Sequence, residues 1–143
     1  MTRSPNRMLG LILGAVFVVL GGVGFVVSSH LPFFDAEGAQ FAWILQVNGL
    51  QNTVHILVGA ALAMAALSNE RASAGVNAWT GAFLLLFGLA GLFLVGEPFN
   101  VFGLNSAVNV VHFAASAVLL AAGLGADSFA ASRTETPDPL ARP

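Results

Sequence analysis

Two segments of the chain carry asparagine and histidine at the same spacing inside apolar sequence. The first is VNGLQNTVHILVG, residues 47–59, and the second is LNSAVNVVHFAAS, residues 104–116. Both follow the pattern N-x-x-x-N-x-x-H, which places the same residue types at Asn48, Asn52, His55, Asn105, Asn109 and His112. An imidazole can donate or accept a hydrogen bond, move a proton or bind a metal, and an amide both donates and accepts. These six residues are therefore the first candidates for chemistry.

The composition of the chain indicates a membrane protein. Hydrophobic residues make up 57% of the 143 residues, charged residues make up 8%, and the mean hydropathy is +0.83. A soluble domain carries about 25% charged residues, so this chain could not cover a surface that faces water. The absence of cysteine excludes disulfides, thiolate metal sites and cysteine nucleophiles. A net charge of −2 without a basic cluster gives no reason to expect nucleic acid as a partner.

Four apolar runs are long enough to cross a bilayer, which takes about 20 helical residues. They cover residues 8–29, 48–67, 78–96 and 106–126, and none of them contains Asp, Glu, Lys or Arg. Continuous runs of this length are typical of helices rather than of the alternating strands of a membrane barrel. The predicted fold is an all-α polytopic membrane protein. Its four-helix domain covers residues 8–126, between a short N-terminal segment (1–7) and a disordered tail (127–143).

The arginines predict the orientation in the membrane. All five lie in segments at one end of the predicted helices: Arg3, Arg7, Arg71, Arg133 and Arg142. The loops at the other end, residues 30–47 and 97–105, contain no basic residue. The positive-inside rule then predicts a multi-pass protein of the cell inner (plasma) membrane with both termini in the cytoplasm. His30 and Glu97 fall in the opposite loops and are expected at the membrane interface.

The two motifs belong to a longer match between the second and fourth runs. An ungapped alignment of residues 47–67 with 104–124 pairs eight identical residues, which predicts two tandem helix pairs, a 2+2 repeat. In a helix, positions i, i+4 and i+7 lie within about 60° on one face. Polar groups that face lipid are costly, so both motifs should point inward, toward each other or a common neighbour. Small residues spaced by about four predict close helix contacts along two further stripes, one at Gly10, Gly14 and Gly22 and one at Ala117, Ala121 and Gly125.

These features resemble a known family. VNGLQNTVHILVG, GEPFNVFGLNSAVNVVH and the four-helix layout are similar to a small, mainly actinobacterial family of integral membrane proteins, catalogued only as domain-of-unknown-function family 4383. The resemblance covers about residues 8–125. Many members carry an acidic residue just before the second Asn-x-x-His, where this chain has Val108. The resemblance implies the fold and supplies no activity.

The main interpretation of the motifs is structural. Asparagine and histidine in membrane bundles form interhelical hydrogen bonds of about 0.6–2 kcal/mol, and Asn48 and Asn105 are also good helix N-caps. The chain is then a structural or accessory component of the bilayer, without a cofactor, whose partners are lipid and either other membrane proteins or further copies of itself.

Two alternatives stay open from the sequence, and an enzyme is not expected. His55 and His112 on parallel helices at one depth could be axial ligands of haem b in a redox module, including one linked to quinone. Alternatively, Glu97, His30 and the motif histidines could be stations of a proton relay or of a small transporter subunit. The chain has no nucleophile–base set, no paired carboxylates and no phosphate loop, and two histidines with asparagines lack the ligands that usually complete a metal site.

Overall fold

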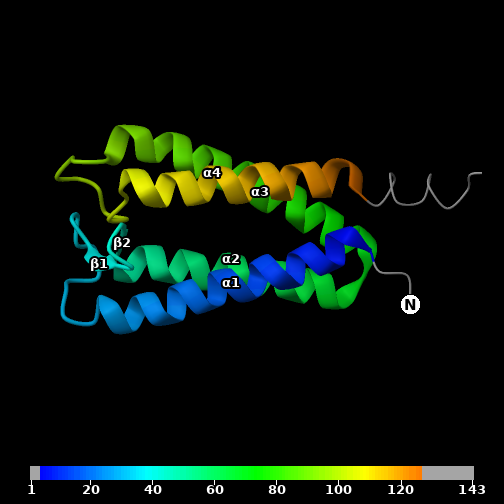
Figure 1. The fold of residues 1–143 in the computed structure, drawn as a ribbon, viewed down its shortest axis with the longest axis horizontal. Coiled ribbons are helices and arrows are strands. Elements are labelled where there is room, and N and C mark those ends of the chain that lie inside the picture. The colour runs from blue at the N-terminus through cyan, green and yellow to red at the C-terminus, as the bar shows by residue number, and fades with distance from the viewer. Residues whose placement is uncertain (1–3, 127–143) are drawn as a thin grey trace, which may run out of the picture.

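The computed structural model describes residues 4–126, in which four long helices form two antiparallel hairpins (Figure 1). The first hairpin pairs α1 (Pro5–Val27) with α2 (Gly49–Ser68), and the second pairs α3 (Glu70–Leu94) with α4 (Ser106–Ala121). The last helix continues into a π-helical turn, η1 (Ala122–Ala126). The expected tail at 127–143 lies outside the described residues.

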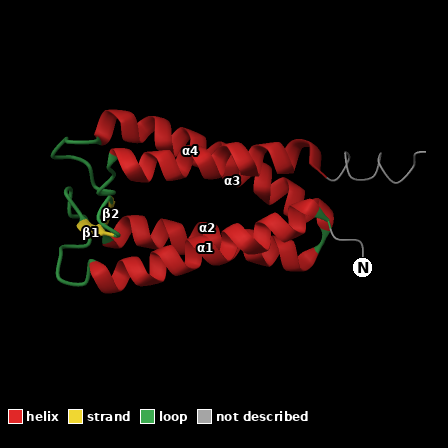
Figure 2. Cartoon of the chain, viewed as in Figure 1, coloured by secondary structure: helices red, strands yellow, loops and turns green. Residues whose placement is uncertain are grey.

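The loops gather at one end of the bundle (Figure 2). We call this the loop end, formed by residues 28–48 and 95–105, and the opposite end, where α2 meets α3, the turn end. The longer loop contains a small antiparallel hairpin of β1 (Ala39–Phe41) and β2 (Leu45–Val47), with Gln40 opposite Gln46. These two short strands were not expected from the sequence.

Four helices in the described residues are long and apolar enough to cross a membrane, which confirms the predicted helical membrane fold. The third helix begins at Glu70, earlier than the apolar run at 78–96 suggested, because polar residues extend it beyond the apolar part. Asn69 alone separates α2 from α3, and its side-chain oxygen accepts from Ala72 N at 2.9 Å. Arg71 therefore lies in the first turn of α3 rather than in a loop.

Each long helix begins after a residue whose side chain caps it. These N-caps are Ser4, Asn48, Asn69 and Asn105. In each, the side-chain oxygen accepts a hydrogen bond from the backbone N–H three residues later, which satisfies one of the free donors at a helix start. The helix starts are therefore determined by local sequence.

Glycine allows the helices of each hairpin to pack backbone to backbone. Gly14 of α1 lies against Gly59 of α2, where a Cβ on Gly14 would come 2.8 Å from the Gly59 carbonyl oxygen. Gly81 of α3 lies equally close to α4. The expected small-residue stripes were only partly right. Gly10 and Gly14 face α2, but Gly22 faces open space, because the contact face of α1 continues through Gly21 and Gly24. Ala117 and Ala121 are exposed, and Gly125 has no neighbour within 4 Å of its Cβ position.

One large apolar side chain from each helix meets in the middle of the bundle. The four are fully buried and form a single cluster: Phe17, Leu62, Leu84 and Leu119. This cluster joins the two hairpins in the middle of the bundle, between the loop end and the turn end. The motif histidines lie between it and the loops, since His55 precedes Leu62, and His112 precedes Leu119, by two helical turns.

Candidate functional site

The histidines of the two motifs meet between the hairpins. His55 of α2 and His112 of α4 are buried, and their Nε2 atoms lie 3.3 Å apart. Phe17 flanks the His55 ring and Phe87 flanks the His112 ring, with ring centroids 5.5 and 5.0 Å apart. The expectation that the two polar faces point toward each other therefore describes the geometry of the histidines.

The first asparagine of each motif caps its helix and also holds a loop. Asn48 Nδ2 donates to the carbonyl oxygens of Asp35 and Val101, at 2.8 Å each, so one side chain ties the long loop to the short one. Asn105 Nδ2 donates to the carbonyl of Ile44, at 2.7 Å, in the turn of the β hairpin. Both asparagines connect the two halves of the chain at the loop end.

The second asparagine of each motif packs against a glycine of its hairpin partner. The Asn52 amide lies on Gly24 of α1, and the Asn109 amide lies on Gly91 of α3, so that a Cβ on either glycine would overlap the amide. Asn52 Nδ2 donates to Ser28 Oγ at 3.0 Å, and Ser28 in turn donates to the Gly24 carbonyl. Among residues 4–126, neither amide atom of Asn109 has a hydrogen-bond partner.

Two further buried amides at the loop end were missed by the sequence reasoning. Asn100 bonds both the N–H and the carbonyl of Leu104 and donates to Ala36 O at 3.2 Å. The Gln51 amide, oriented with its nitrogen toward two carbonyls, donates to Phe102 O and Gln46 O at 3.0 Å each. Gln51 lies within the first motif, and Asn100 lies within EPFNVFG. The signal that could have identified both residues is that they are polar residues within apolar sequence.

A separate polar contact joins the hairpins at the turn end. Asn77 of α3 is fully buried and donates from Nδ2 to both the carbonyl and the Oδ1 of Asn6, at 3.1 and 2.8 Å. Asn77 lies one residue before the apolar run expected for the third helix, so it was not among the expected site residues. It is far from the histidines along the bundle, since α3 continues for more than four turns toward the loop end.

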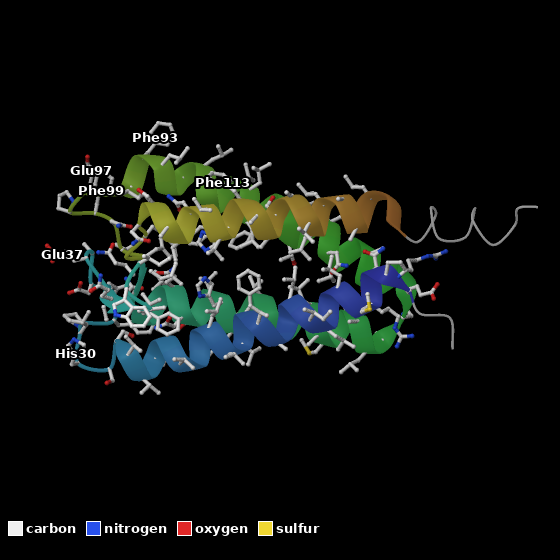
Figure 3. All side chains as sticks on the ribbon, viewed as in Figure 1. His30, Glu37, Phe93, Glu97, Phe99 and Phe113 are labelled. Atoms are coloured by element: carbon white, nitrogen blue, oxygen red, sulfur yellow. The ribbon has the colours of Figure 1, made fainter. Side chains whose placement is uncertain are left out.

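His30 and Glu97 are not part of the motif centre. Both are exposed at the loop end, where His30 follows α1 and Glu97 follows α3 (Figure 3). Within the described part of the chain, no three His, Cys, Asp or Glu residues are grouped closely enough to hold a metal ion. Aromatic rings flank the histidines, and the amides of Asn52 and Asn109 lie on glycines of the neighbouring helices.

The fold and the buried centre define a four-helix integral membrane protein with an amide and histidine core. The chain belongs to the family described as domain of unknown function (DUF4383), whose model matches residues 7–125. This confirms the resemblance inferred from the motifs. Neither a curated protein nor a solved structure matches the chain.

Proposed function

We propose that this protein is a structural or accessory component of the plasma membrane, in which the two motifs lock one helix hairpin against the other. The observation that carries the proposal is the contact between His55 and His112 across the hairpin interface, with 3.3 Å between the Nε2 atoms. Such a bond, buried in an apolar bundle, fixes the register of the two hairpins together with the amide contacts at the loop end and the turn end.

The arrangement of charge supports an orientation with both termini in the cytoplasm. Arg7 and Arg71 lie at the turn end, where Arg7 Nε donates to the Ala66 carbonyl of α2 at 2.7 Å. Asp35, Glu37 and Glu97 lie at the loop end, whose loops contain no basic residue. The positive-inside rule then favours a cytoplasmic turn end.

The motif spacing also supports an origin in two related helix pairs. Asn48 and Asn105 both cap a helix, Asn52 and Asn109 both lie on a glycine of the preceding helix, and the histidines pair with each other. Equivalent roles at equivalent positions are what a duplicated hairpin would produce.

The distance between the histidines favours direct contact over axial ligation of a haem iron. Metal–imidazole bonds of about 2.0–2.1 Å would place two nitrogens on opposite sides of a metal about 4 Å apart. The observed 3.3 Å is shorter, so a haem would require the hairpins to separate. The relay alternative has less support, because His30 and Glu97 are exposed and away from the pair.

Substitution of each histidine by Gln and by Leu tests the proposal. Gln retains a donor and an acceptor, whereas Leu leaves the opposite histidine buried without its partner, which should cost about 1–3 kcal/mol. We expect the Gln variants of His55 and His112 to keep most of the thermal stability in detergent, and the Leu variants to lose it. Equal damage from Gln and Leu, together with loss of a Soret band present in the parent, would instead support the haem alternative.

A further inference from the structure

The buried polar atoms that lack a partner are concentrated at the two motifs. Within residues 4–126, seven buried side-chain atoms have no hydrogen-bond partner, and five of these belong to four motif residues: Asn52 Oδ1, His55 Nδ1, Asn109 Oδ1, Asn109 Nδ2 and His112 Nδ1. All four side chains are at most 3% exposed. Buried polar groups in native proteins are almost always paired, and when no protein group pairs with them an ordered water molecule usually does.

The short contact between the histidines fixes how their protons are distributed. Only one proton can lie between Nε2 of His55 and Nε2 of His112, because two would repel each other at 3.3 Å. Among the described helices, the only Asp or Glu is Glu70, at the turn end, so a charged imidazole here would be buried without a counter-ion. Two neutral rings must then be opposite tautomers. One ring then carries its proton at Nδ1, and the Nδ1 of the other ring is an unprotonated acceptor.

The unpaired buried atoms of the two motifs therefore include both donors and acceptors. One histidine Nδ1 donates and the other accepts, Asn109 offers a free N–H₂ and a free oxygen, and Asn52 offers a free oxygen. A carboxylate or phosphate could satisfy only the donors, and a cation only the acceptors. A small neutral molecule that both donates and accepts satisfies both, and water is the simplest of this class.

We propose that ordered water satisfies the unpaired buried atoms of Asn52, His55, Asn109 and His112, and that the two histidines share one exchangeable proton. This extends the proposed function, since it rests on the same histidine contact. In the exchange, the Nε2–H bond of His55 breaks as the Nε2–H bond of His112 forms. The Nδ1 proton of His112 passes to water, and water returns a proton to His55 Nδ1. Both rings stay neutral, and their tautomers have been exchanged.

Nuclear magnetic resonance of ¹⁵N-histidine protein in detergent micelles tests the proposal. The chain has three histidines, so His30→Gln leaves only the buried pair. Ring nitrogen shifts separate protonated from bare nitrogens. We expect either two complementary tautomers or a single set of shifts averaged between them, and magnetisation transfer from water to the ring N–H protons. The same tautomer at both histidines would overturn the shared proton, and the absence of transfer from water would overturn the water site.

Asn109→Leu provides a second test, with Val110→Leu as the matched control on the exposed side of the same helix. If the amide holds water, Asn109→Leu should lower the melting temperature and weaken the transfer from water, while Val110→Leu leaves both unchanged. A higher melting temperature in Asn109→Leu would mean that the amide is dry, which overturns the site. This proposal and the proposed function can fail separately. If both histidines tolerate Gln but have the same tautomer, the structural role of the histidine contact is supported and the shared proton is rejected.

Discussion

Gly21 of α1 and Asn52 of α2 are in direct backbone contact: a Cβ on Gly21 would come 2.6 Å from the Asn52 carbonyl oxygen. This contact brings α1 to the turn of α2 that carries the first motif. The side chain of Asn52 lies on Gly24, one turn further along α1. The polar centre is therefore built on a close glycine-lined contact, and its geometry depends on that contact.

We predict that Gly21→Ala destabilises the protein and that Gly22→Ala does not. The added methyl at residue 21 meets the Asn52 backbone and Ile56 Cγ1 at 2.6 Å, and overpacking of this kind costs about 1–3 kcal/mol. At residue 22 nothing lies within 4 Å, so alanine should be neutral or add up to about 1 kcal/mol through its helix propensity. Thermal melting in one detergent compares the two neighbours directly. Equal melting temperatures would contradict the tight α1–α2 contact.

Asn48→Ser should separate capping from the connection between the loops. Serine still caps α2 but cannot reach both the Asp35 and Val101 carbonyls, which would lose their 2.8 Å donor. A loss of about 1–3 kcal/mol is expected, reduced by any water that replaces the amide. The control is Asn69→Ser, because Asn69 caps α3 and its amide makes only an exposed bond to Ser68 Oγ. That variant should change stability by less than about 0.5 kcal/mol.

Reporter fusions should give both termini as cytoplasmic. A reporter active in the cytoplasm, fused after Arg133, and one active outside, inserted between Asp35 and Gln40, should both be active. The physical reason is the asymmetry of arginine, which is absent from the loop end. An inactive reporter at either position, in protein that is still inserted, would reverse the orientation or change the number of spans.

Trp43 should lie at the membrane interface near the loop end. It is 88% exposed in the turn after β1, and Gln40 donates to its carbonyl at 2.8 Å. Asn105 donates to the carbonyl of the next residue, Ile44, which places the backbone of this turn beside the start of α4. Tryptophan prefers the interface. With Trp79→Phe leaving Trp43 as the only tryptophan, nitroxide lipids labelled near the headgroup should quench fluorescence more than lipids labelled near the chain end. Quenching by aqueous iodide alone would place Trp43 in water, and the converse variant, Trp43→Phe, reports on Trp79.

The sequence alone determined the spans, the starts of α2 and α4, and the faces that carry the motifs. Four charge-free apolar runs can satisfy their backbone hydrogen bonds in lipid only as helices. A helix start after asparagine depends only on the few residues around the cap. The N-x-x-x-N-x-x-H spacing places each asparagine–histidine set on one helical face, whatever lies opposite. For these reasons, the membrane fold and the inward direction of His55 and His112 could be predicted without coordinates.

Only the tertiary structure decided which partners these residues meet. Asn52 and Asn109 hold the same position in the motif, yet only Asn52 has a hydrogen-bond partner for its amide among the described residues. The reason is that the C-cap residue of α1 is Ser28, whereas the C-cap residue of α3 is Val95. The use of Gly21 rather than Gly22 follows from the crossing of two helices, which no local pattern encodes. The 3.3 Å between the histidines likewise depends on how the two hairpins pack against each other around the shared apolar cluster of Phe17, Leu62, Leu84 and Leu119.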